Sequence, residues 1–529
     1  MATTHRDASK AACLILAAGG ALLHGSAHAQ TRTQSVTPTL AVKLEHTDNV
    51  DGVSDAPGQV RRAEDILTVN PSLLFQHKGA TTTVEGRFGL LVEQRLRGTD
   101  SNRILPDGLV RWRTALPEQG VGLDASLQAQ QVKPSISSVG QASGSTSNAA
   151  TETRAHVGPF LERRVSERET VIARINGDAQ RTDPRDDQQR TTRTRAGSAQ
   201  LAWLSRPAPF GYSLEANALN ERTDNDTPAQ SASVPASSEQ GQTRQAVVRA
   251  TLLYNWNQEL EVGLIAGTER DRRRVTLDTA GTRLESERNF DGPFGGFLAT
   301  WRPTPRTTLS GRYESRESGR NWNTEFSHSL RRTTFALISS QTTARNAPTV
   351  VTGNSLTTGA VPGTGATPTP TPGTPFPGST DASSPLTARN EIASAALTLQ
   401  RNTALRVTYA GVRSTLNLTS GRFQSRALLT APGVVAGTDR SRYNAAAVSY
   451  RLTPDVTPSA GLRWSRAHDA LGVARREWLW TLGLGIRLSP WTVIESGFSM
   501  LRSTATSTAS PDDARTVIHS ANIRLEHRF

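Results

Sequence analysis

Apolar and polar residues alternate with a period of two in many segments of the chain. Between 84 and 92 the even positions include Val84, Leu90 and Val92, while the odd positions carry charged residues such as Glu85. Similar rows occur at 121–129, at 478–488 and at the chain end. This period is typical of β-strands with one apolar and one polar face, and the helical spacing of i, i+3 and i+4 is hard to find.

The connections between these segments alternate between short and long. Short connections are expected at 78–80, 117–120, 166–169, 206–209, 257–259, 303–305, 331–332, 401–402, 453–455 and 489–490. Long polar stretches lie at 133–151, 181–191, 222–241, 345–388 and 417–438. Short periplasmic turns and long extracellular loops are typical of outer-membrane barrels, whereas a soluble β-sandwich has no physical reason to sort its connections in this way.

The pattern therefore predicts an all-β fold, a transmembrane antiparallel up-and-down β-barrel of roughly 22 strands, with 18–24 strands possible. The range is wide because 273–287 and 417–438 either hide an extra hairpin or lengthen existing strands. The first strand is expected about eight residues after a predicted cleavage site, which leaves no room for a plug domain. The barrel is expected to occupy residues 30–529.

The N-terminus predicts export from the cytoplasm. Arg6 and Lys10 precede an apolar stretch, and Ala27-His28-Ala29 has the small-x-small pattern of a cleavage site. We therefore expect residues 1–29 to be a signal peptide. Cleavage would remove Cys13, the only cysteine, so the exported chain would hold no disulfide. Together with the strand pattern this predicts localisation in the bacterial outer membrane.

The last strand is the most regular one, with apolar Ile523 and Leu525 alternating with polar residues up to the terminal Phe529. In a closed barrel the last strand pairs with the first, so that no backbone edge remains unsatisfied in lipid. The terminal Phe529 with apolar residues at alternate positions resembles the signal that bacterial barrel-assembly machinery recognises, although His527 stands where an aromatic residue is common. We therefore expect that machinery to be a partner of the C-terminal strand.

Tryptophan positions test the barrel prediction independently. Amphipathic rings are expected to form belts at both membrane interfaces. One group lies near short turns and a second group nearer the long loops, while Trp491 lies at a turn on the wrong parity. The predicted interface girdle consists of Trp112, Trp203, Trp256, Trp301, Trp464, Trp478 and Trp480, and Trp322 also lies near a long loop.

Composition changes the picture through charge. The chain of 529 residues has 36% hydrophobic residues, a mean hydropathy of −0.44 and a formal charge of +13, and arginine far outnumbers lysine. Many arginines share the inward parity with acidic residues, where a wet lumen keeps them hydrated. The predicted lumenal charges are Glu85, Arg87, Glu93, Arg95, Arg312, Glu314, Arg524, Glu526 and Arg528. Most of them are expected to form a self-neutralising lining, and the positive excess favours anionic solutes.

Catalytic chemistry finds little support in the sequence. The histidines are scattered without metal-ligand spacing, and neither a nucleophile elbow nor a P-loop is present. We expect no enzyme activity, no cofactor, no metal and no nucleic-acid partner. Acidic loop residues such as Asp48 and Asp183 are expected to be solvated, with bridging of lipopolysaccharide phosphates through divalent ions as the alternative. Outer-membrane lipid and lipopolysaccharide are expected partners.

Between 347 and 388 proline, threonine and glycine dominate the sequence. Such a composition cannot build a packed core, and the segment falls where an extracellular loop is due. Two interpretations stay open: a surface tether, or a segment that folds inward and narrows the pore.

The opening of the barrel resembles a known family. Thr47-Asp48-Asn49 at the end of the first strand and Asn70-Pro71-Ser72-Leu73 within the second are similar to outer-membrane barrels of exopolysaccharide loci, the exosortase (PEP-CTERM) system-associated and porin-like proteins. The resemblance implies a porin-like role in exopolysaccharide production or export, passing polymer or anionic solute, with anionic exopolysaccharide and periplasmic export components as partners. The alternative is a non-conducting surface barrel whose extracellular loops mediate adhesion or matrix attachment.

Overall fold

The computed structural model describes residues 33–50, 53–55, 60–98, 102–116, 118–132, 150–184, 191–205, 209–228, 236–279, 282–345, 397–429, 437–468, 473–507 and 510–529. These residues form one sheet of 22 strands. The first eleven strands are β1 (Thr33–Thr47), β2 (Glu64–Lys78), β3 (Thr82–Arg95), β4 (Arg103–Leu116), β5 (Val121–Val132), β6 (Ala150–Arg164), β7 (Glu169–Pro184), β8 (Thr191–Ser205), β9 (Phe210–Thr227), β10 (Ser237–Asn255) and β11 (Leu260–Thr279). The others are β12 (Thr282–Thr304), β13 (Thr307–Arg316), β14 (Gly319–Ser329), β15 (Thr333–Arg345), β16 (Leu397–Ala410), β17 (Ser414–Leu429), β18 (Thr438–Tyr450), β19 (Val456–His468), β20 (Ala474–Ser489), β21 (Thr492–Ser507) and β22 (Ser510–Arg528).

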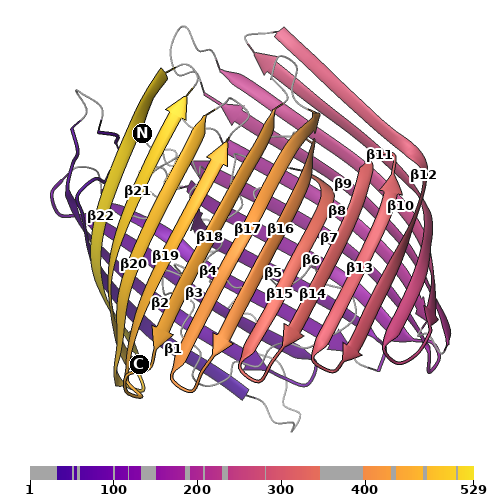
Figure 1. The fold of residues 1–529 in the computed structure, drawn as a ribbon, viewed down its shortest axis with the longest axis horizontal. Helices are drawn as coiled ribbons and strands as arrows, with labels where there is room; N and C mark the ends of the chain where they lie inside the picture. Colours follow the sequence, from indigo (N-terminus) through magenta and orange to yellow (C-terminus); the bar gives the residue numbers. More distant parts are fainter. Residues whose placement is uncertain are drawn as a thin grey trace.

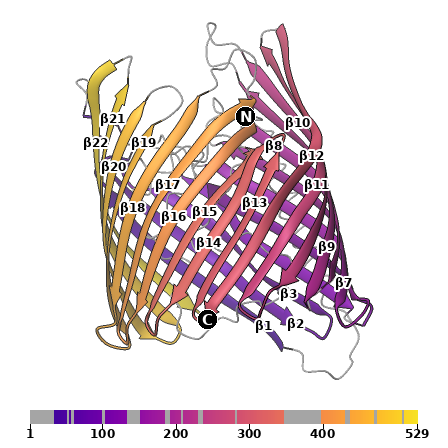
Figure 2. The ribbon, with the colours of Figure 1, turned by 45° about the vertical axis from the view of Figure 1, so that its right-hand side comes forward.

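The sheet closes on itself, as the sequence predicts. Each strand pairs antiparallel with its neighbours in the chain, and β22 pairs with β1, from Thr39 opposite Arg528 to Thr47 opposite Ser520. The Phe529 amide donates a hydrogen bond to the Pro38 carbonyl oxygen at 3.0 Å. Figures 1 and 2 show the tilted strands of this barrel, with the C-terminus beside the start of β1. The prediction of a 22-strand antiparallel barrel is confirmed, and localisation in the bacterial outer membrane follows from it.

The two faces of the sheet differ as alternation predicts. On β20, Trp480 and Leu482 are exposed, with 51% and 59% of their surface accessible, while Leu479 is buried. The exposed row is the outward, lipid-facing one. Side chains on the concave inner face converge because the wall is curved, so that even charged residues such as Glu314 are almost fully buried there. Within the described residues every segment is a strand or a connection between strands, and none forms a plug.

The short connections lie at one end, which we call the turn end, and most predictions for them hold to within two residues. The turn expected at 401–402 is wrong. Those residues lie inside β16, and the chain turns at 411–413, where the Gly411 amide bonds the Ser414 carbonyl oxygen at 2.7 Å. Arg401 lies inside β16, near the opposite end of the barrel, and faces outward. Its charge therefore did not indicate a turn.

At the opposite end, which we call the loop end, the strands are longer than expected. Residues 273–287 hold no extra hairpin; they lengthen β11 and β12, which have 20 and 23 residues. The expected loop at 417–438 begins as strand, because β17 runs to Leu429. Not every connection at this end is long: β13 and β14 are joined through 317–318 alone.

The extended β11–β12 hairpin leans across the loop end. Its inner face places Val275, Leu277 and Phe290 against Leu428 and Leu429 at the end of β17. The Arg288 guanidinium also donates a hydrogen bond to the Leu428 carbonyl oxygen at 2.8 Å. Four strands, β13–β16, separate β12 from β17 in the sheet. The hairpin therefore passes over the lowest part of the wall, where it rises beyond its neighbours in Figure 1.

Two predictions fall outside the described residues: the signal peptide at 1–29 and the Pro/Thr/Gly-rich loop at 347–388. Among the residues that the structure describes, no helix is long and apolar enough to cross a membrane.

Candidate functional site

The inner face of the barrel is the candidate functional surface. All nine predicted lumenal charges lie on the inward parity, in three separate sectors: β3, β13 and β22. The structure does not bring these three sectors together into one site. Glu93 and Arg95 are almost fully buried against the wall, whereas the side chains of Glu85 and Arg87 are about half exposed.

Ion pairs join many of these residues, though not always as expected. Arg312 pairs with Glu314 at 2.5 Å and Arg524 with Glu526 at 2.6 Å, as the sequence predicts. Arg87 does not pair with its strand neighbour Glu85; it reaches Asp107 on β4. Asp107 lies opposite Gly89, so Arg87 reaches it diagonally across the β3–β4 pair, and the residue opposite Glu85 is Arg111.

Sequence reasoning missed most of a largely buried ion-pair network that crosses β9–β13. Glu314 forms ion pairs with Arg249 at 3.1 Å and with Arg316 at 2.5 Å. Arg249 also pairs with Glu215 at 2.7 Å, and Arg316 with Glu269 at 3.1 Å. The sequence shows which residues of each strand face inward. Finding this network would also have required the register between five successive strands, β9–β13.

The network is neutral as a whole. With Arg312 it holds three arginines, and three glutamates face them: Glu215, Glu269 and Glu314. The Ser318 amide adds a hydrogen bond to Glu269 at 3.1 Å. A neutral network of this kind holds neighbouring strands together and offers no free positive charge to a solute.

An aromatic ring lies beneath this network. Phe294 on β12 faces Gly267 on β11, and the guanidinium carbon of Arg316 lies 4.5 Å from the ring centre. The same arrangement recurs on β5 and β6, where Phe160 faces Gly122 and two arginines approach its ring. In each case the missing Cβ of glycine leaves the space in which the ring lies.

Substituting Gly267 with alanine is expected to destabilise the barrel by about 1–3 kcal/mol, because the added Cβ clashes with the Phe294 ring and with the Val248 carbonyl oxygen. Guanidinium unfolding of protein refolded into lipid vesicles measures the effect. Gly197→Ala is the control, since nothing lies within 4 Å of the Cβ it would add. Equal stability of the two variants would contradict the packing role of Gly267.

The predicted girdle tryptophans lie near the two ends of the barrel. Trp112, Trp203 and Trp301 are on outward positions close to the turn end, and Trp256 lies in the turn itself. Trp464 and Trp478, close to the loop end, lie directly opposite each other with their ring centres 6.3 Å apart. Trp480 follows on the same face of β20. Their role as an interface girdle stays a prediction, as does the role of Phe529 in assembly.

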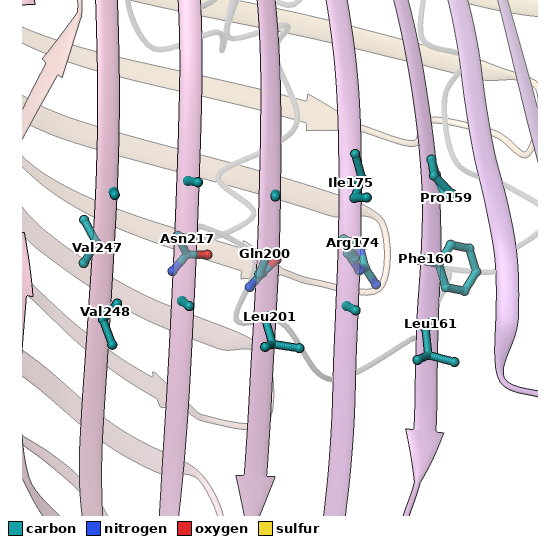
Figure 3. A pocket seen from close by; sticks show the side chains of 15 residues that line it. Pro159, Phe160, Leu161, Arg174, Ile175, Gln200, Leu201, Asn217, Val247 and Val248 are labelled. Atoms are coloured by element: carbon teal, nitrogen blue, oxygen red, sulfur yellow. The ribbon is translucent and has the colours of Figure 1, made fainter. Parts of the chain in front are cut away.

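A shallow apolar depression lies on the outward face of β6–β10, not in the lumen. Figure 3 shows Leu161, Leu201 and Val248 in one row across alternate strands. Alanines on the outward positions between them, such as Ala216 and Ala218, leave the surface hollow. This depression lies on the outward, lipid-facing side of the wall.

Among the residues that the structure describes, no group of three or more histidine, aspartate or glutamate side chains could hold a metal ion. The inner face therefore offers charged and polar side chains arranged around a wide lumen. What it can do chemically is hydrate, orient or exclude a solute.

No family model and no curated protein matches the chain. Solved structures do. The siderophore receptor PiuA from Acinetobacter baumannii matches with a TM-score of 0.54 and 8% identity over 93% of this chain and 82% of that one. The FrpB iron transporter from Neisseria meningitidis matches with a TM-score of 0.52 and 11% identity, over 93% and 82%. The ferric-catecholate import receptor Fiu from E. coli K12 matches with a TM-score of 0.54 and 10% identity, over 93% and 81%. At this identity the likeness establishes the fold, a 22-strand outer-membrane barrel.

Proposed function

We propose that this protein is a porin-like conduit that passes a hydrophilic solute across the outer membrane. The observation that carries the proposal is the closed 22-strand wall with a charged inner face and no described segment across the lumen. Twenty-two strands about 4.8 Å apart and tilted by about 40° give a backbone diameter of about 44 Å. Barrels of 16–18 strands already leave an aqueous channel.

The solute class is the finer part of the proposal. The buried network on β9–β13 is neutral and offers no anion site, so a preference for anionic solutes rests on the charge of the whole chain, +13. The resemblance to barrels of exopolysaccharide loci favours a polymer carrying carboxylates. A wide wall of 22 strands lined with hydrated charges suits a flexible polar chain.

Planar-bilayer recording tests the conduit directly. We expect single-channel steps larger than those of a 16-strand porin recorded in the same salt, because channel width grows with strand number. A KCl gradient should give a reversal potential that favours chloride. Full membrane insertion without any conductance would defeat the proposal and would support the surface barrel that mediates adhesion. Uptake by proteoliposomes of a uronic-acid oligosaccharide, compared with a neutral oligosaccharide of equal size, tests the solute class separately.

A further inference from the structure

Four arginines form a row across the outer face of β17–β20. Arg422 lies directly opposite Arg442, Arg442 opposite Arg466, and Arg466 opposite Arg476. All four side chains are exposed and lie on the outward parity. We call these residues the arginine row. The sequence alone does not predict the row, because its members are far apart in the chain and are aligned only by the register of β17–β20.

The row lies immediately beyond the aromatic pair at the loop end. Trp464 precedes Arg466 by two residues on β19, and Trp478 follows Arg476 by two residues on β20. Beyond the tryptophans, toward the turn end, β20 presents Leu482 to the lipid. Aromatic belts mark the boundary between hydrocarbon and headgroups. The arginine row is therefore at the level of the lipid headgroups of the outer leaflet.

Within the part of the chain that the structure describes, no acidic side chain neutralises the arginine row. Like charges directly opposite each other on neighbouring strands are destabilising. The outward positions of the described residues of β17–β20 include no aspartate or glutamate. The Arg466 guanidinium lies 3.4 Å from the imidazole of His468. Two outward arginines on β9 and β11 do have acidic partners: Arg222 pairs with Asp224 at 3.0 Å, and Arg270 with Asp291 at 2.9 Å. Among the described residues the row therefore has no acidic counter-charge on its own face of the sheet.

We propose that the arginine row binds the phosphate groups of lipopolysaccharide, with the acyl chains of the lipid A portion against the apolar face below Trp464 and Trp478. Guanidinium groups match phosphate oxygens with paired hydrogen bonds and stay charged at any physiological pH. Phosphates between adjacent arginines remove the repulsion along the row. The binding couples this sector of the barrel to the outer leaflet, independently of what passes through the lumen.

Native mass spectrometry of the detergent-solubilised barrel, titrated with diphosphoryl lipid A, tests the proposal. In the double variant Arg442→Gln/Arg466→Gln we expect binding to weaken at least tenfold. The control Arg222→Gln/Arg270→Gln removes the same charge from the same face and the same end of the barrel. These two arginines already have acidic partners, so the control should bind lipid A within twofold of the unchanged protein. Arg442→Lys/Arg466→Lys, which keeps the charge, should retain most of the binding.

Two outcomes would overturn the proposal. One is equal weakening by the row variant and the control variant, which would mean that overall charge alone attracts the lipid. The other needs no variant: lipid A stripped of its phosphates binding the unchanged protein as tightly as diphosphoryl lipid A. Heat-dependent gel mobility checks that each variant is folded. If the Gln variant does not fold, the comparison of the two lipids on the unchanged protein decides the matter.

Discussion

Glu314→Gln is expected to lower the free energy of unfolding by about 3 kcal/mol. The substitution keeps the size of the side chain but removes the negative charge that Arg249, Arg312 and Arg316 share. Breaking a buried ion pair on one side costs about 3–5 kcal/mol because the opposite charge stays buried without compensation. The lower end applies here, since Glu215 and Glu269 remain. Guanidinium titration of the refolded barrel, followed by tryptophan fluorescence, measures the loss.

Glu85→Gln is the matched control on the same lumenal face. The Glu85 side chain is 51% exposed, and its partner Arg111 lies 3.9 Å away. Exposed pairs of this kind contribute about 0–1 kcal/mol. A Glu314 variant as stable as the Glu85 variant would show that water hydrates the β9–β13 network enough to replace the missing carboxylate, and the structural role given to it would be wrong.

Ile523→Arg should prevent much of the protein from reaching the folded state. Ile523 faces outward on β22, with 52% of its surface exposed, five residues before the turn-end limit of the strand at Arg528. That position is near the middle of the hydrocarbon layer, where an arginine costs about 2–4 kcal/mol. The strand also closes the barrel, so the defect falls on the seam with β1. The folded fraction on a heat-modifiability gel, with lipid-vesicle refolding, is the measurement.

Asn522→Arg, one residue away, is the control for parity. Asn522 points into the lumen, directly opposite Glu45 of β1 across the seam. An arginine there lies on the polar inner face opposite the Glu45 carboxylate and does not enter hydrocarbon, so refolding should match that of the unchanged protein. If both substitutions impaired folding equally, the assignment of inner and outer faces to alternate residues of β22 would be wrong.

The wall of the barrel could be predicted from the sequence because every second residue of a strand that crosses the hydrocarbon layer must be apolar. On β20 every second residue from Trp478 to Leu488 is apolar, and the structure places them all outward. Beyond the bilayer both faces of a strand meet water, so the alternation of apolar and polar residues is no longer required. For residues 273–287 the sequence therefore left two interpretations open, an extra hairpin or longer strands, and the structure shows longer strands.

The candidate sites were harder to predict for a different reason. A single strand reveals which residues share a face, but not which residues on other strands face them. Glu314 and Arg316 could be assigned to the lumen from parity, whereas Arg249 joins them through a contact 65 residues distant in the chain. The arginine row depends in the same way on the register of four strands. The turn predicted at 401–402 failed because Arg401 and Asn402 are polar residues within a strand, not at its end.

The confirmed strand count sharpens the question of permeability. A barrel with fewer strands would have a narrower lumen, through which fewer solutes leak across the outer membrane, but the wall has 22 strands. Two explanations stay open: the predicted inward-folding segment at 347–388, which lies outside the described residues, and a separate protein that fills the lumen. Conductance of the purified barrel, compared with the permeability of cells that make it, distinguishes the two: a partner is lost on purification, whereas the chain's own segments are kept.

The β11–β12 hairpin is held at two places. One is its continuation into the membrane-embedded wall, and the other is the contact of Phe290 and Arg288 with the end of β17. A hairpin held at two places bends less under thermal motion than one held only at its base. Losing this small contact would release the whole length of the hairpin at once, so the rigidity of one rim depends on a few side chains five strands away.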